Sequence, residues 1–174
     1  MASKMNQIEK YIEEEKWEKA RKEILKELRS HKDDHWLIIR LSTTYYEEKK
    51  YKKAFELAAK ALKLTPNCTL VLWDYAGTLN MLGRNIEAIK TYQKIIKKGV
   101  DKIAYGECGE GLLWAKALYT DSFYRLALCY SEIGNLKKFE EYFEKHLSSR
   151  GKGIPSIYKL VYVKKKYNQI LKAI

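Results

Sequence analysis

The sequence has 174 residues and a formal net charge of +12, and 46% of its residues are hydrophobic and 13% aromatic. A chain of this length and hydrophobic content can bury a core, which argues against intrinsic disorder. Only two prolines and nine glycines are present, and Leu, Ile, Ala, Glu and Lys dominate. This composition predicts mostly helical structure.

The N-terminal segment 1–10 is polar and is not followed by an apolar stretch, so it does not resemble a signal peptide. No apolar run approaches the roughly 20 residues that a membrane-spanning helix needs. We therefore expect a cytoplasmic protein without a membrane partner. Three widely spaced cysteines, Cys68, Cys108 and Cys129, form no CxxC pair. Such cysteines are typical of reduced thiols packed as small apolar side chains.

Apolar positions recur with a period of 34 residues through the first half of the chain. The recurring positions are Tyr11, Tyr45 and Leu79, and Ala20, Ala54 and Ala88. A period of this length is typical of stacked helix-turn-helix units, none of which can bury its apolar face alone. The spacing predicts units over approximately 2–34, 35–68 and 69–98.

The second unit has the most complete pattern. Its first helix carries Ile38, Leu41, Ser42 and Tyr45, its second helix carries Ala54, Ala58 and Ala61, and Pro66 follows. These spacings resemble the tetratricopeptide (TPR) repeat, whose pattern is W-x2-L-G-x2-Y, then A-x3-F, then P. The resemblance implies an all-α, right-handed superhelix of about four TPR-like helix pairs, forming a single domain over 1–174. It also implies a concave surface that binds partners.

The fourth unit, 112–150, arrives late, because a glycine-rich insertion over 99–111 precedes it. Residues 112–133 contain no glycine or proline, so the first helix of this last pair is predicted to be elongated, with about 22 residues. Its first turns carry Leu112, Trp114, Ala115 and Leu118. They either pack on the insertion and cap the array, or meet a partner.

A capping helix is predicted over 156–174, after the Gly-Lys-Gly-Ile-Pro segment that ends at Pro155. Ser156 is the expected N-cap. Apolar side chains occupy one face of this helix, and the other face carries a basic surface formed by Lys159, Lys164, Lys165 and Lys166. The last 24 residues contain six lysines and no acidic residue, which favours acidic partners.

The resemblance implies which side chains line the concave groove, since the first helix of each TPR pair faces it. In the second unit these are Trp36, Ile39, Arg40, Thr43 and Glu47; in the third, Trp73, Asp74, Asn80 and Met81; in the fourth, Tyr124, Arg125 and Leu128. Aromatic and Arg side chains often anchor interfaces. The alternative is that Trp36 and Trp73 pack between neighbouring helices. The Lys/Asn carboxylate clamp of chaperone-binding TPR proteins is missing at the matching positions.

No catalytic motif is found, and neither a metal nor a cofactor is expected. His31 and His35 bracket two aspartates, but Asp34 is better explained as a helix cap. We therefore predict a non-enzymatic scaffold or adaptor that holds a peptide or helix of a partner protein, an acidic one included, in the groove. Two alternatives stay open: nucleic-acid association through the lysine-rich C-terminal helix, and self-assembly into a homo-oligomer.

Overall fold

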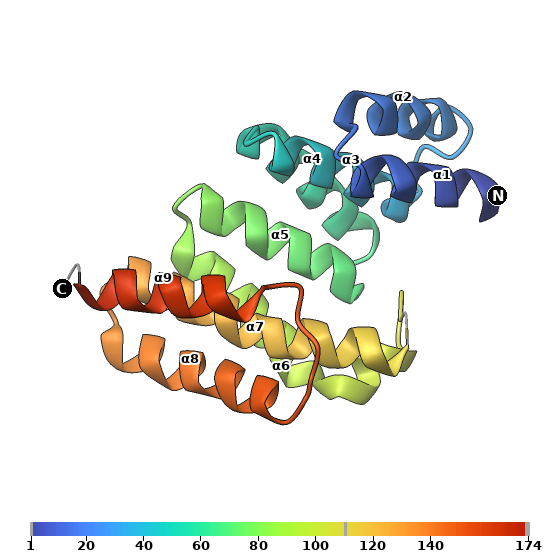
Figure 1. Ribbon diagram of the computed structural model, residues 1–174. Coiled ribbons are helices and arrows are strands. Elements are labelled where there is room, and N and C mark those ends of the chain that lie inside the picture. The colour runs from blue at the N-terminus through green and yellow to red at the C-terminus, as the bar shows by residue number, and fades with distance from the viewer. Residues whose placement is uncertain (1, 110, 173–174) are drawn as a thin grey trace. The chain divides into compact units, whose positions relative to one another are not determined.

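The computed structural model describes residues 2–109 and 111–172, and these residues form helices and turns without a β-strand (Figure 1). The helices are α1 (Ala2–Glu13), α2 (Trp17–Leu28), α3 (His35–Glu47), α4 (Tyr51–Leu64), α5 (Thr69–Met81), α6 (Asn85–Tyr105), α7 (Leu112–Glu132), α8 (Leu136–Gly151) and α9 (Leu160–Lys172). Consecutive helices pack as the pairs α1–α2, α3–α4 and α7–α8. The predicted all-α helical-repeat fold is confirmed. In the described part of the chain, no helix has both the length and the apolar character needed to cross a bilayer.

The turn within each helix pair is built in the same way four times. The backbone carbonyl at the recurring apolar position accepts a hydrogen bond from the N–H five residues later, at 2.8–2.9 Å. The residue before that N–H has positive φ in every pair: Glu15 (55°), Lys49 (61°), Gly83 (74°) and Gly134 (73°). The recurring apolar position therefore lies in the last turn of each first helix, and the left-handed residue that follows reverses the chain.

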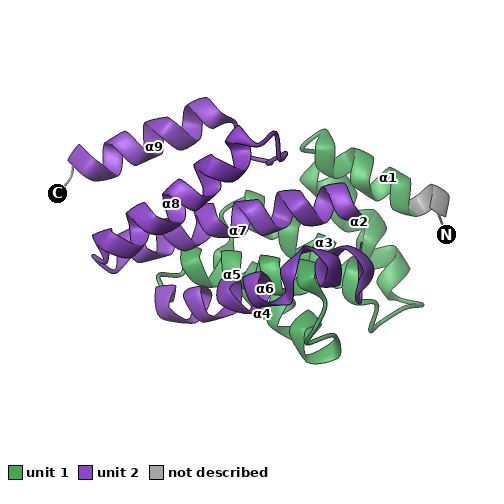
Figure 2. Cartoon of the chain, turned by 90° about the horizontal axis from the view of Figure 1, so that it is seen from below, with its two compact units in different colours: residues 1–84 green, residues 85–174 purple. Residues whose placement is uncertain are grey.

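The chain divides into two compact units, which we call unit 1 (residues 1–84) and unit 2 (residues 85–174) (Figure 2). Unit 1 contains α1 to α5, and unit 2 contains α6 to α9. The expectation of a single domain over the whole chain stays a prediction. The two units are described separately below.

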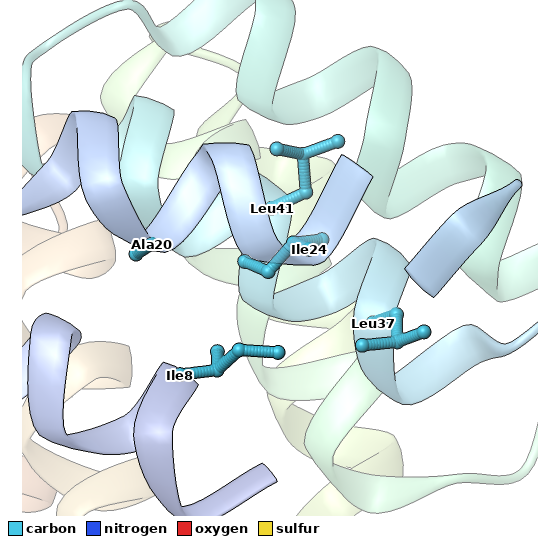
Figure 3. Packing of buried hydrophobic residues seen from close by; sticks show 5 residues of the cluster. All are labelled: Ile8, Ala20, Ile24, Leu37 and Leu41. Carbon is cyan, nitrogen blue, oxygen red and sulfur yellow. The ribbon is translucent and has the colours of Figure 1, made fainter. Parts of the chain in front are cut away.

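The core of the first repeat lies in unit 1. Five buried side chains, contributed by α1, α2 and α3, form one cluster in Figure 3: Ile8, Ala20, Ile24, Leu37 and Leu41. Ala20 has no exposed surface and is placed where a larger side chain would separate α2 from its neighbours. The small residue of the repeat period thus sets the close approach of helices within unit 1.

Unit 2 contains the elongated helix that the sequence predicts. Helix α7 has 21 residues and packs along α6 and α8. Helix α6 does not end at the expected insertion. It bends at Gly99, whose φ of 74° is non-helical, and continues to Tyr105, so the expected insertion is helical up to this residue. Ala115 and Leu118, predicted to pack on the insertion or on a partner, are buried, whereas Leu112 is exposed.

The C-terminal helix begins four residues later than predicted. Ser156 is not its N-cap, because Ser156 Oγ accepts a hydrogen bond from the N–H of Tyr158 (3.0 Å) in a non-helical segment. Helix α9 starts at Leu160 and lies against α7 and α8 in Figure 1. Its buried Val163 contacts the same cluster as Phe139 and Phe143. The predicted role of a cap over the last repeat is therefore supported by this packing.

Candidate partner-binding surface

Two side-chain pairs connect the first helices of successive repeats in unit 1. Arg40 Nε on α3 donates a hydrogen bond to Glu9 Oε1 on α1 at 2.6 Å. Thr43 Oγ1, one turn further along α3, donates to Asp74 Oδ2 on α5 at 3.0 Å. The residues of both pairs are partly exposed. These two links define what we call the inner surface of unit 1.

The two links occupy the same positions of the repeat. Glu9 and Thr43 are 34 residues apart, and so are Arg40 and Asp74. Each link therefore joins one position of a repeat to a second, different position of the next repeat. The first link is an ion pair, and the second replaces it with a hydroxyl and a carboxylate.

Asp74 is the most perturbed acid of this surface. Partial burial raises its pKa to about 6, against the attraction of Arg40 and the hydrogen bond from Thr43; repulsion from Glu47 adds to the increase. The pKa of Glu47 is also raised, by loss of hydration and by repulsion from Glu15. Carboxylates thus outnumber cations at this surface. A donor from outside the chain would stabilise the ionised form of Asp74.

Trp36 has two roles on this surface. Its ring packs on the core cluster of the first repeat, as the alternative explanation from sequence anticipates. The Arg40 guanidinium lies over the same ring, 5.3 Å from its centroid. The aromatic ring and Glu9 together hold the guanidinium in place. A similar arrangement joins Arg21 of α2 to Glu48 and Tyr45 at the C-terminal end of α3.

The other predicted groove residues of unit 1 divide by exposure. Ile39 is fully buried, so it cannot line a surface, because this position of α3 faces other helices. Trp73 and Asn80 are partly exposed, and Met81 and Glu47 are exposed. Of the predicted groove residues of unit 1, burial therefore removes Ile39 from the surface.

The predicted groove residues of unit 2 are largely covered by the unit's own chain. Tyr124 is buried, and its ring centroid lies 4.8 Å from that of Tyr158, in the segment before α9. Leu128 packs on the cluster that α9 covers. Arg125 Nε donates to the buried Tyr92 hydroxyl at 3.0 Å. Tyr124 is thus not available as a groove residue, because the cap occupies its surroundings.

The lysines of the predicted basic surface are all exposed. Lys159 precedes α9, and Lys164, Lys165 and Lys166 lie on the helix. Val163, Tyr167 and Ile170 of the same helix face the core of unit 2. The amphipathic pattern expected from the sequence is therefore correct only in part: Tyr167 and Ile170 of the apolar face pack on the core, whereas Leu160, Val161 and Leu171 are exposed.

A buried polar cluster of unit 2 was not identified from the sequence. Asp121 Oδ2 accepts a hydrogen bond from the Ile157 N–H at 2.9 Å, and Asp121 Oδ1 lies 3.7 Å from His146 Nδ1. Burial raises the pKa of Asp121 to about 6, against hydrogen bonds from Ser156 and Ile157 and the attraction of Arg150. Burial lowers the pKa of His146, although a bond to the Thr120 carbonyl opposes this. The cluster anchors the segment before α9.

The repeat register contains a signal for this cluster. The third and fourth units are offset by 51 residues, so Asp121 is equivalent to Leu70 of the third unit and His146 is equivalent to Ile95. Both earlier positions are apolar and buried. Polar residues at two core positions of a repeat indicate a local partner, which here is the segment before α9.

Neither the histidine-containing loop nor the cysteines suggest a catalytic role. Asp34 Oδ1 accepts a hydrogen bond from the Leu37 N–H at 3.1 Å, so it is the N-cap of α3 as expected. Cys68 and Cys129 are buried, and burial raises the pKa of the Cys129 thiol to about 12. A buried thiol with such a pKa is a poor nucleophile.

Two segments of the chain match the sequence model of the tetratricopeptide repeat, residues 37–68 and 120–152. The first contains most of α3 and all of α4, and the second contains most of α7 and all of α8. They correspond to the second and fourth predicted units. No curated protein resembles the chain closely enough to count as a match.

Solved structures of MamA proteins share the fold. MamA from Desulfovibrio magneticus RS-1, from residue 41 to its end, is 16% identical, with a TM-score of 0.66 over 85% of this chain and 74% of that chain. A double mutant of MamA RS-1 gives 17% identity and the same TM-score and coverage. MamA MSR-1 is 18% identical, with a TM-score of 0.58 over 82% of this chain and 72% of its own.

Proposed function

Because this chain is a tetratricopeptide repeat protein, we propose that it is a non-catalytic adaptor that holds a segment of a partner protein on the inner surface of unit 1. The observation that carries the proposal is the pair of links between successive first helices, Glu9 with Arg40 and Thr43 with Asp74. They place partly exposed, oriented polar groups on the helices that line the partner-binding face of this repeat family.

The charges of this surface indicate the chemistry of the segment. Glu9, Glu47 and Asp74 are opposed by Arg40, whose guanidinium already bonds Glu9. A partner with Lys, Arg or other donor groups would therefore relieve the electrostatic penalty on Asp74. This differs from the acidic partner expected from the net charge, since that excess of lysine lies elsewhere on the chain.

Enzymatic activity is not part of the proposal. The polar groups of the inner surface are committed to positioning one another, and the buried Asp121 and His146 are closed off from solvent. A rigid array that presents side chains from several helices suits binding, where pre-organisation lowers the entropic cost of association. We propose that this pre-organisation is the role of the helical array in this chain.

The test is affinity capture from a native lysate treated with nuclease, using the full chain and the variant Arg40→Ala/Asp74→Ala. A protein retained by the wild type should be reduced at least about tenfold on the variant, which corresponds to about 1.4 kcal/mol. Purified partner and isothermal titration calorimetry then give the affinity directly.

Arg21→Ala is the matched control for this experiment. Arg21 is also a partly buried arginine, bonded to Glu48 at 2.9 Å and lying over Tyr45, but it belongs to α2. Its loss removes comparable contacts without touching the inner surface. Equal loss of the partner from both variants, or release of all partners by nuclease, would contradict the proposal. Thermal denaturation checks that each variant is folded.

A further inference from the structure

The outward face of α9 has an unusual composition for a capping helix. Val161 and Tyr162 are 68% and 64% exposed, and Leu160 and Leu171 are also exposed. Lysines fill the positions between them, and the chain from residue 151 onward has no acidic residue. A cap that only protects a repeat array needs a polar outer face and gains nothing from exposed aliphatic side chains.

Part of this face forms one stripe along the helix. Helical spacing of about 100° per residue places seven exposed residues in one sector, which runs from the margin of the buried face, at Leu160 and Leu171, to the side of the helix opposite Val163. The stripe consists of Leu160, Val161, Lys164, Lys165, Asn168, Leu171 and Lys172. Its apolar residues lie at the two ends and its lysines lie between them or beside them. All seven are exposed.

The lysines of this stripe have not been neutralised by the chain itself. Within residues 2–109 and 111–172, none of the ion pairs includes Lys164, Lys165 or Lys172. Elsewhere in unit 2, exposed lysines do pair on their own helix, as Lys138 and Lys145 do with Glu141 at 2.7 Å. The positive charge of α9 is therefore directed outward.

We propose that the stripe on α9 is a second docking surface, which binds an acidic amphipathic helix of a partner protein. In a helical array neighbouring helices cover one another's faces, and the stripe on α9 is exposed within the described residues of unit 2. A partner helix with aliphatic residues opposite Leu160, Val161 and Leu171 would cover this face in the same way. Carboxylates on it would meet the lysines of the stripe.

The combination of lysines and aliphatic side chains in the stripe favours an acidic partner helix over nucleic acid and over an anionic membrane. Nucleic acid would match the lysines, but its phosphates offer no counterpart to aliphatic side chains. An anionic membrane would match both, yet interfacial helices have an uninterrupted apolar face with lysines at its edges. On α9 Lys164 and Lys165 lie within the stripe, where they would oppose insertion. This proposal does not depend on the inner surface of unit 1.

The experiment measures binding of the full chain to a fluorescent synthetic helix with Glu and Leu on one face, and to a peptide of the same composition in scrambled order. The test variant is Lys164→Glu/Lys165→Glu/Lys172→Glu. The charge-matched control is Lys52→Glu/Lys90→Glu/Lys94→Glu, which changes three exposed lysines on α4 and α6. Circular dichroism confirms the helical content of both.

We expect the ordered peptide to bind at least about tenfold more tightly than the scrambled one, and the α9 variant to lose at least that factor while the control keeps most of it. A peptide with Lys in place of Glu should restore binding to the α9 variant. Leu160→Ser/Leu171→Ser should weaken binding without changing charge, which separates helix docking from simple charge attraction.

Three results would overturn the proposal. One is equal binding of the ordered and scrambled peptides, and another is equal loss in the α9 variant and the control. The third is failure of the ordered peptide together with α9-dependent binding to phosphatidylserine vesicles or to an oligonucleotide, which would assign the surface to that partner. Failure of the inner-surface variant Arg40→Ala/Asp74→Ala to lose its partner bears only on the function proposed above.

Discussion

The same repeat position has different surroundings in the two units. Arg40 and Asp74 in unit 1, and Arg125 in unit 2, are equivalent by the 34- and 51-residue spacings. In unit 1 these residues bond across neighbouring first helices at the surface. In unit 2 Arg125 bonds the buried Tyr92, and the neighbouring Tyr124 is covered by Tyr158. The repeat spacing therefore identifies equivalent residues in the two units, but the element that packs on each residue decides whether a partner can reach it.

The largest expected effect on stability concerns the core of unit 2 that α9 covers. Phe143 is 2% exposed and stacks on Tyr167 of α9 with ring centroids 4.4 Å apart. Phe143→Ala should reduce the free energy of unfolding by about 3–5 kcal/mol, because it leaves a cavity under the cap. Urea denaturation followed by circular dichroism measures this. Ile86→Ala, at an exposed site of the same unit, should change it by less than about 0.5 kcal/mol; similar losses would mean that α9 does not seal this core.

The next effect concerns the polar cluster that anchors the segment before α9. The pKa of Asp121 is raised to about 6 from an ordinary value of 3.8, so the folded state binds the proton more tightly. Its contribution to stability is therefore largest below pH 3.8 and is lost as the pH rises to 6, by up to about 3 kcal/mol. Asp121→Asn, whose amide oxygen can still accept from the Ile157 N–H, should abolish this loss.

The comparison is made by urea denaturation from pH 4 to pH 7. His146 imposes the opposite trend, because a lowered pKa makes stability fall as the pH drops below 6.5. The variant should therefore gain stability steadily with pH, and should exceed the wild type at pH 7. His146→Gln serves as the complementary variant and should keep the Asp121 trend. An unchanged pH slope in Asp121→Asn would exclude Asp121 as the titrating group.

A smaller effect distinguishes the helix-pair turns. Lys49 in unit 1 has a φ of 61°, where the matching residue of unit 2 is Gly134. Lys49→Gly should stabilise the protein by about 0.5–1 kcal/mol, because the strain of a side chain in the left-handed region outweighs the added freedom of glycine in the unfolded chain. Gly134→Ala should destabilise by about 1–2 kcal/mol through backbone strain alone, since no atom lies within 4 Å of the added carbon. Thermal denaturation of both variants tests the pair; shifts of the same sign would contradict this reading.

The smallest effect is local to the inner surface of unit 1. Arg40→Met removes the main charge that favours ionised Asp74, so the pKa of Asp74 should rise above about 6. NMR titration of the Asp74 side-chain carboxyl measures the change. Arg21→Met removes an arginine of the same unit that does not act on Asp74, and it should leave this pKa unchanged.

The fold could be predicted because its signals are local and repeated. Tyr45 and Ala54 mark a helix end and a close helix contact within a single repeat, and the 34-residue period multiplies that information. The elongated α7 followed from the lack of glycine and proline over 112–132. The start of α9 could not be predicted from Ser156, because the Ile157 N–H donates a long-range hydrogen bond to Asp121 and the residues after Ser156 are held outside a helix.

The candidate site was predicted in part for the same reason. Arg40, Thr43 and Asp74 were identified by register, but their mutual pairing depends on how successive helices are offset. Ile39 and Tyr124 were assigned to a groove although they are buried, since register does not reveal which neighbour covers a helix face. The balance of carboxylates on the inner surface was hidden by a net charge of +12 that the C-terminal lysines help to supply.

Proteolysis at the lysines of α9 can report how stably this helix packs on unit 2. Trypsin cleaves after lysine only where the backbone can unfold locally and enter the protease active site. The side chains of α9 that trypsin recognises are exposed, at Lys164, Lys165 and Lys166. Their peptide bonds are protected from cleavage as long as Val163 and Tyr167 hold the helix on the core of unit 2. The rate at which a C-terminal fragment is released therefore measures how often α9 detaches from unit 2. A ligand that covers its outer face should slow that rate, and a ligand on the inner surface of unit 1 should leave it unchanged.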